Sequence, residues 1–392
     1  MTTTINNEHK KLNVPNLRFP EFQGEWEKCK VSDLLDFYST NSLSWDKLEY
    51  GTTNIQNLHY GLIHVGLPTM VDIDKDNLPN IIDGNVPKNY ELCKEGDIVF
   101  ADASEDTNEV AKAVEYYNLN GKKVVCGLHT IHGRDNKNKT VVGYKGYAFS
   151  SMSFHHQIRR IAQGTKIYSI NSKNFSECYV GIPSKDEQQK IADLLRLIDE
   201  RIATQNKIID KLQSLIKGIA QNIVRNNKPN VRLSECLESK SSTLQESDVC
   251  EQGTYPVYGA NGIVGYLDNY NTEGEAVYII KDGSGVGTVS YVKGKCSATG
   301  TLNTLQAKEG YSLQYLYYLL KVFNFEPYKT GMAIPHIYFK DYGKAKVFCP
   351  SYTEQLQYAR LLSAIDNKLS IEQNILTELT LQKQCLLRQM FI

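Results

Sequence analysis

One apolar pattern occurs twice in this chain of 392 residues, and it limits the folds that the chain can adopt. In each copy, apolar residues recur at alternating intervals of four and three positions, the spacing that packs one long helix against another. The first seam comprises Ile191, Leu195, Ile198, Ile202, Gln205, Ile209, Leu212, Ile216, Ile219 and Ile223. The second seam follows 167 positions later and comprises Tyr358, Leu362, Ile365, Leu369, Glu372, Leu376, Leu379, Lys383, Leu386 and Met390. The pattern therefore predicts a duplicated long helix.

Polar residues interrupt the two seams at matching positions. Gln205 in the first seam corresponds to Glu372 in the second, and Lys383 is a further polar residue of the second seam. A polar pair inside an apolar seam often fixes its register, so we expect the helices to pack antiparallel with Gln205 near Glu372. The residues expected to pair the helices are Ile198, Ile202, Gln205, Ile209, Ile365, Leu369, Glu372 and Leu376.

The same offset holds upstream of both helices. The matched residues include Gly164, Ile167 and Ile170, and 167 positions later Gly331, Ile334 and Ile337. Each helix also begins with a serine followed three residues later by a glutamate, Ser184 with Glu187 and Ser351 with Glu354, which predicts two reciprocal capping boxes. Two unrelated amphipathic helices on separate cores are the alternative, and the shared offset, caps and periodicity disfavour it.

A globular segment precedes each helix, and the two segments share little beyond their ends. We expect a flexible leader at 1–22, globular domains at 23–183 and 227–350, and helices at 184–226 and 351–392. In the first domain, Glu95-Gly96-Asp97 followed by Ile98-Val99-Phe100 predicts a turn and a buried strand. The expected fold class is α/β (α+β), with two globular domains, two long antiparallel helices and an internal pseudo-two-fold repeat.

The net charge gives no indication of a nucleic-acid partner, because Lys plus Arg and Asp plus Glu both number 44. Residues 121–166 are nevertheless strongly basic and carry interleaved histidines and aromatic rings, a mixture suited to phosphates and bases. An ordinary solvated face is the alternative interpretation. The candidate DNA contacts of the first domain are Lys122, Lys123, Arg134, Lys137, Lys139, Tyr144, Arg159 and Arg160.

Two glycine-rich loops mark the second domain, at 255–266 and 282–287. Such loops could cradle phosphate or could be plain hairpin turns, and both interpretations stay open. The candidate DNA contacts of this domain are Tyr258, Asn261, Lys281, Ser284, Lys293 and Lys295.

Sequence motifs for catalysis or metal binding are not visible. The chain has no Walker loop, H-E-x-x-H, G-x-S-x-G or base-holding N-P-P-type motif. Its nine cysteines include no C-x-x-C pair, and His129 and His132 have no spaced partners, so we expect surface or core histidines and no metal site. With no signal sequence and no membrane-length apolar run, we expect a reduced, cytoplasmic protein.

Two variable segments, each followed by a repeated helix, resemble the specificity (S) subunit of Type I restriction-modification enzymes. The matching features are Leu17-Arg18-Phe19-Pro20, Gly24-Glu25-Trp26, Ile182-Pro183-Ser184 with Glu187-Gln188-Gln189, Tyr258-Gly259-Ala260-Asn261-Gly262 and Pro350-Ser351 with Glu354-Gln355. The resemblance implies a non-catalytic chain whose two domains each read one half of a split site on double-stranded DNA.

The resemblance also implies partners. Two methyltransferase (M) subunits would dock on the helices and restriction (R) subunits would join them. S-adenosylmethionine, ATP and Mg²⁺ would bind the partner subunits, which carry adenine-N6 methylation and DNA cleavage. A coiled-coil scaffold without DNA specificity is the alternative, and an enzyme with an unrecognised site is a third interpretation.

Overall fold

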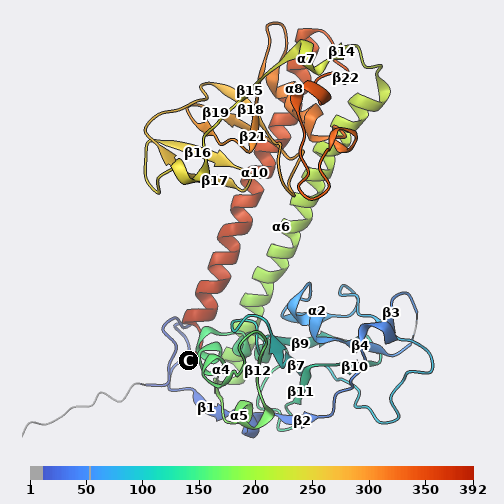
Figure 1. The fold of residues 1–392 in the computed structure, drawn as a ribbon. Coiled ribbons are helices and arrows are strands. Elements are labelled where there is room, and N and C mark those ends of the chain that lie inside the picture. The colour runs from blue at the N-terminus through green and yellow to red at the C-terminus, as the bar shows by residue number, and fades with distance from the viewer. Residues whose placement is uncertain (1–11, 53) are drawn as a thin grey trace, which may run out of the picture. The chain divides into compact units, whose positions relative to one another are not determined.

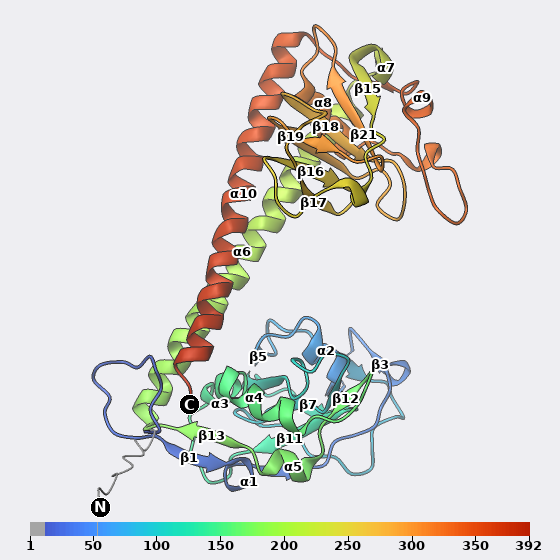
Figure 2. The same cartoon turned by 60° about the vertical axis from the view of Figure 1, so that its left-hand side comes forward.

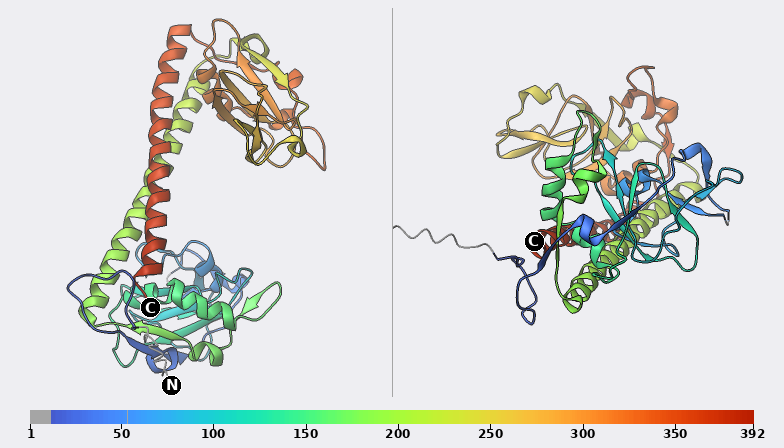
Figure 3. Two further views of the ribbon diagram at one scale, coloured as in Figure 1. Left: turned by 90° about the vertical axis from the view of Figure 1, so that its left-hand side faces the viewer. Right: turned by 90° about the horizontal axis from the view of Figure 1, so that it is seen from below.

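The computed structural model describes residues 12–52 and 54–392, which form two compact units. The first unit holds the described residues up to Thr204 together with Leu376–Ile392, and the second holds Gln205–Ile375. Each unit contains part of α6 (Lys185–Asn226) and part of α10 (Tyr352–Gln389), which lie side by side (Figure 1, Figure 2 and Figure 3). Both units mix helices with strands, as the expected fold class requires.

The described residues of the first unit form two larger sheets and two strand pairs. The five-stranded sheet has the order β2 (Asp36–Tyr38), β11 (Thr130–Arg134), β7 (Ile98–Ala101), β9 (Ala113–Asn118) and β5 (Met70–Asp72). The four-stranded sheet has the order β10 (Val124–Cys126), β4 (Gln56–Leu58), β6 (Asn80–Ile81) and β3 (Leu48–Glu49). The pairs are β1 (Glu27–Lys30) with β13 (Tyr179–Ile182), and β8 (Ala103–Ser104) with β12 (Tyr168–Ser169). The helices are α1 (Val31–Leu34), η1 (Trp45–Lys47), α2 (Tyr60–His64), α3 (Tyr144–Phe149), α4 (Met152–Ile161) and α5 (Ser172–Ser176).

Strand β7 lies in the middle of the five-stranded sheet, and all four of its residues are buried. This confirms the buried strand predicted after Glu95-Gly96-Asp97. Phe100 of β7 packs edge-to-face on Phe149 and Phe175, which joins the sheet to α3 and α5 in one apolar core.

The contacts of residues 17–26 contradict two expectations, the length of the leader and the capping box of the first helix. Residues 1–11 of the predicted leader lie outside the described residues, but Leu17 donates its N–H to the carbonyl of Gln389, so the leader does not extend that far. The carboxylate of Glu187 accepts two 2.7 Å hydrogen bonds from Arg18 and one from Trp26, and therefore does not close a capping box with Ser184. The reciprocal box forms only on the second helix, between Ser351 and Glu354.

The second unit is built around an antiparallel sheet. Its order is β15 (Leu237–Ser241), β21 (Leu302–Ala307), β18 (Glu275–Ile280) and β19 (Val289–Lys293). A smaller sheet has the order β17 (Gly262–Leu267), β16 (Tyr255–Gly259) and β20 (Ser297–Ala298), and β14 (Val231–Arg232) pairs with β22 (Lys346–Val347). The helices are α7 (Leu233–Cys236), η2 (Glu246–Asp248), α8 (Leu313–Lys321), η3 (Glu326–Tyr328) and α9 (Phe339–Tyr342).

Every position of the two apolar seams is buried or half-buried in the described chain. In the second unit, the Gln205 side-chain amide donates to the Glu372 carbonyl at 3.0 Å and to its carboxylate, and Lys368 pairs with the same carboxylate. In the first unit, Lys383 pairs with Asp199 at 2.6 Å. The polar seam residues therefore have partners within the chain.

The two units contain equivalent internal contacts. Tyr144 donates to the Gly181 carbonyl in the first unit, and Tyr315 donates to the Phe348 carbonyl in the second. Gln188 donates to the Pro183 carbonyl, and Gln355, 167 positions later, donates to that of Pro350. Tyr147 donates to Asp199, and Tyr318 donates to Asp366. The duplication therefore repeats this set of contacts, which we call the framework. The segments between the framework elements differ between the two units, and we call them the inserts.

Candidate nucleic-acid interface

The basic segment 121–166 does not fold into one element. It runs through the turn before β10, strands β10 and β11, a loop, and helices α3 and α4. Its cations therefore differ in exposure and in partners, and each has to be judged separately as a DNA contact.

Two predicted contacts are buried, and the structure contradicts their assignment. The Arg134 guanidinium makes two 2.8 Å hydrogen bonds to the buried carboxylate of Asp97 and a 2.6 Å ion pair with Glu91. The Tyr144 side chain is completely buried, and burial raises the pKa of its hydroxyl. Neither side chain can reach DNA without unfolding its surroundings, so both are structural residues.

Four lysines of the segment lie at the surface on two loops. Lys122 and Lys123 occupy the turn between β9 and β10, where the Lys122 ammonium donates to the Ile73 carbonyl. Lys137 donates to the Asp33 carbonyl, and Lys139 forms a 2.7 Å ion pair with Glu27. Since Glu27 is itself exposed, a phosphate could replace it at little cost.

Two arginines of the segment lie on α4. The Arg159 guanidinium donates to Asn108 and to His156, and Arg160 is exposed. Arg160 also lines a polar cavity of about 660 Å³ together with Lys28, His156 and Tyr179. This cavity gathers cationic and aromatic side chains that are distant in the sequence, and sequence reasoning missed Lys28.

The glycine-rich segment 255–266 forms most of the hairpin of β16 and β17, and the segment 282–287 connects the antiparallel strands β18 and β19, so both follow the hairpin alternative. Asn261 is exposed in the two-residue turn between β16 and β17, and Tyr258 is half-buried on β16. Ser284 is exposed and Lys281 half-buried at the β18–β19 connection. Lys293 and Lys295 are exposed, and the Lys295 ammonium lies 4.8 Å from the centre of the Tyr270 ring.

An aromatic surface in the first unit was not predicted. Trp45 is exposed, and its ring centre lies 4.5 Å from that of the buried His59. The ring centre of Tyr60 lies 5.2 Å from that of the exposed His129. Flat rings of this kind can stack on bases. The sequence signal was weak, because these residues are separated by up to 84 positions and only His129 belongs to the basic segment.

The repeat also presents two equivalent hairpins. Gln163 pairs with Ser169 in the first unit, and Thr330 pairs with His336 in the second. Each hairpin exposes an isoleucine at the same repeat position, Ile167 at 62% and Ile334 at 65%. Each begins with a glycine that has no room for a side chain, because a Cβ at Gly164 or Gly331 would lie 1.9 or 2.4 Å from a carbonyl oxygen across the loop. The repeated glycine was visible in the sequence, but the exposure of the tips was not. We call these two segments the repeat hairpins.

Comparisons with known proteins also find the chain to be duplicated. The family model of the Type I restriction modification DNA specificity domain matches residues 24–214 and again residues 226–381. The chain belongs to this family, and its role is therefore in DNA sequence specificity. Specificity subunits of type I restriction-modification systems are generally non-catalytic.

Individual relatives support this assignment. A Mycoplasma genitalium protein described as a type I specificity subunit is 26% identical over 269 residues, which are 62% of this chain and 69% of that protein. The MjaX specificity subunit described in Methanocaldococcus jannaschii is 23% identical over 407 residues, covering 93% of this chain and 92% of that one. The crystal structure of the S subunit from M. genitalium has the same fold, with a TM-score of 0.63 and 19% identity over 97% of this chain and 99% of that chain. Over residues 12–52 and 54–392, no helix has the length and apolar character needed to cross a bilayer.

Proposed function

We propose that each domain of this specificity subunit reads one half of a split DNA site, and that the helices dock two M subunits. The repeated framework carries this proposal. Tyr144–Gly181 and Tyr315–Phe348 are the same contact made twice, yet the inserts between framework elements have different strands and loops. Equal frames suit two equal partners, and unequal inserts suit two different half-sites.

The proposed DNA contacts are the members of the candidate set that are exposed or half-buried. In the first domain they are Lys122, Lys123, Lys137, Lys139, Arg159 and Arg160, and in the second they are Tyr258, Asn261, Lys281, Ser284, Lys293 and Lys295. Cations of this kind fix a protein on the phosphate backbone, whereas Tyr, Asn and Ser side chains can reach base edges.

Exposed apolar side chains support docking on the helices. Leu197 and Leu215 of α6 and Leu361, Ile371 and Leu381 of α10 are all about half exposed. Large apolar side chains repeated along an exposed helix indicate a protein interface. The repeat hairpins add the same kind of side chain at equivalent places in both units, which suits two copies of one partner.

The remaining parts of the complex follow from the same proposal. R subunits would join the complex of this chain with its M subunits. S-adenosylmethionine, ATP and Mg²⁺ would bind the partner subunits, and this chain would supply the DNA specificity.

A salt titration of DNA binding tests the phosphate contacts. The chain would be bound to its M subunits and mixed with DNA that carries the methylated site. Replacing Lys122, Lys123, Arg159 and Arg160 by alanine should reduce the slope of log affinity against log salt by about 0.9 for each lost phosphate contact. Lys185→Ala, an exposed cation at the start of α6, is the control and should leave the slope unchanged. An unchanged slope in the quadruple variant would refute the assignment, and a complex that binds all DNA sequences equally would favour the scaffold interpretation.

A further inference from the structure

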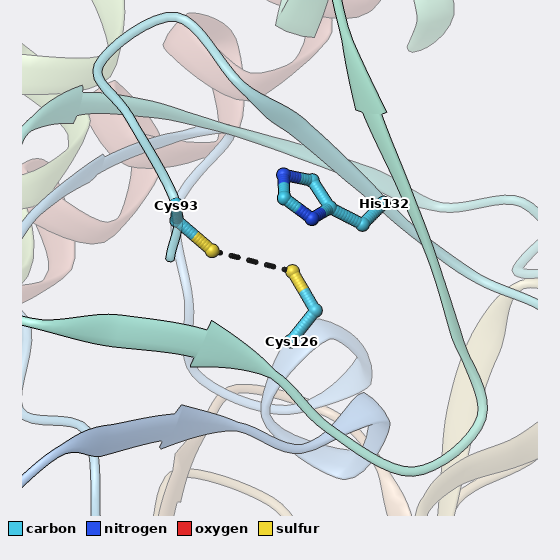
Figure 4. A group of neighbouring side chains, drawn as sticks. All are labelled: Cys93, Cys126 and His132. Atoms are coloured by element: carbon cyan, nitrogen blue, oxygen red, sulfur yellow. Dashed lines mark hydrogen bonds between the residues drawn. The ribbon is translucent and has the colours of Figure 1, made fainter. Parts of the chain in front are cut away.

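A cluster of three buried side chains lies between the two larger sheets of the first unit. Cys126 ends β10 of the four-stranded sheet, His132 lies on β11 of the five-stranded sheet, and Cys93 precedes β7. The N–H of Cys93 donates to the Val124 carbonyl at 2.8 Å, which fixes the Cys93 loop against β10. Figure 4 shows the three side chains pointing toward one another, and their ligand atoms all lie within 4.8 Å of each other.

His132 is oriented by a carboxylate. Its Nε2 lies 2.7 Å from the Asp97 carboxylate, which also accepts hydrogen bonds from Arg134 and from the Lys94 backbone. When Nε2 donates its N–H to this carboxylate, a neutral imidazole keeps a lone pair on Nδ1, which is the atom that could bind a metal ion.

That Nδ1 is the unexplained feature of the cluster. His132 is completely buried, and its Nδ1 has no hydrogen-bond partner among the residues that the structure describes. A buried polar atom without a partner is destabilising and rare in folded proteins, so such an atom calls for an explanation. A histidine that binds a metal ion usually donates its other ring N–H to a carboxylate, which fixes the orientation of the ring, and His132 and Asp97 have this arrangement.

The two thiols supply the matching ligands. Their sulfur atoms lie 3.4 Å apart, much longer than the bond of about 2.05 Å in a disulfide. Two thiolates at about 2.3 Å from one tetrahedral ion would be about 3.8 Å apart, so a small adjustment brings both onto the same ion.

We propose that Cys93, Cys126 and His132 bind a zinc ion that ties the two sheets of the first domain together. Sulfur and imidazole ligands suit Zn²⁺, whereas Mg²⁺, Ca²⁺ and Mn²⁺ prefer oxygen. Two thiolates cancel the charge of Zn²⁺, whereas Cu⁺ would leave a net negative charge in an apolar core. These residues supply three of the four ligands of a tetrahedral zinc ion, and a water molecule would take the fourth position.

Binding releases the protons of both thiols to solvent. Because each bound ion displaces these protons, the affinity should increase with pH. The three ligands are separated by 33 and 6 positions, which matches no short zinc motif and explains why the sequence predicted no metal site.

Cobalt binding to the full chain tests the proposal. The reduced protein would be stripped with a chelator and titrated with Co²⁺, whose thiolate charge-transfer and tetrahedral d–d absorption report the ligand set. We expect one equivalent of Co²⁺, displacement by Zn²⁺, and a higher urea midpoint in the zinc form. Cys126→Ser and His132→Gln should weaken Co²⁺ binding at least tenfold. Cys178→Ser, which removes a buried thiol of the same unit outside the cluster, should bind as the wild type does.

Three results would overturn the proposal. The wild-type chain, which needs no folding control, could show no thiolate–cobalt absorption. The Cys126→Ser variant, checked for native circular dichroism, could retain the wild-type spectrum. Mass spectrometry could instead find Cys93 and Cys126 joined as a disulfide in protein taken from cells. None of these results bears on the DNA-specificity proposal, because that proposal does not use the metal.

Discussion

The Glu115 carboxylate on β9 is completely buried and ties this strand to the beginning of α3. It pairs with the buried ammonium of Lys145 at 2.9 Å and accepts hydrogen bonds from the N–H groups of Gly143 and Gly146. We predict that Glu115→Gln lowers the free energy of unfolding by about 3–5 kcal/mol, because it leaves a buried ammonium without its counter-charge. Urea unfolding followed by circular dichroism measures this. Glu177→Gln, which breaks the exposed ion pair with Lys30, is the control and should have little effect, so equal losses in both variants would contradict the prediction.

The Gln205–Glu372 contact should set the register of the helix pair at a cost in stability. We predict that Gln205→Leu or Glu372→Leu alone lowers the free energy of unfolding by about 1–3 kcal/mol, because each leaves a buried polar group with fewer partners. The double variant should lose much less than the sum of the two, since an all-apolar seam is restored. A double-mutant cycle in urea measures the coupling, and strict additivity would show that the contact contributes nothing.

At the level of residues, the sequence predicted the polar positions in the seams. It did not predict which cations of the basic segment are buried. Arg134 and Lys145 look like surface cations, yet Asp97 and Glu115 neutralise them inside the unit. Such pairing depends on which strands become neighbours, and composition does not contain that information. The cluster of Cys93, Cys126 and His132 was missed for the same reason.

The repeat hairpins lead to a prediction at the level of elements. If each hairpin docks one M subunit, Ile334→Asp should weaken one of the two docking events at least tenfold, because it replaces a buried apolar contact with a desolvated charge. Native mass spectrometry should then find one M subunit per chain where the wild type has two, and Ile167→Asp should do the same. Val65→Asp is the control, since Val65 is 77% exposed but belongs to no repeat. Two M subunits bound at wild-type affinity in either hairpin variant would contradict the docking role.

Long helices could be predicted because their signal is local and periodic. The strands could mostly not be predicted, because β3 and β4 have only two and three residues, too few to show alternation. Their pairing is also non-local, as in the parallel pairing of β5 with β9. The capping box on α6 failed because Arg18, distant in the sequence, takes the Glu187 carboxylate.

At the level of the whole molecule, the repeat predicts a ruler for the DNA site. The seam from Ile191 to Ile223 spans 32 residue steps, about 48 Å of helix at about 1.5 Å per residue. Inserting one seam-preserving heptad at matched positions in both helices should lengthen the gap between half-sites by at most about three base pairs, or about 10 Å. The half-sites themselves should stay the same, because the inserts are untouched. An active complex with the original gap, or with altered half-sites, would show that the helices do not set the spacing.

The repeat predicts that there are two half-sites, but which bases each domain reads depends on loop side chains that the sequence does not place. Sequencing the methylated adenines of a genome tests the central claim most directly, in cells that carry this chain with its M subunits and in cells that lack the chain. The account predicts methylation that depends on the chain and falls in one motif of two defined halves separated by unspecified bases. A single uninterrupted motif, or the same methylation without this chain, would contradict it.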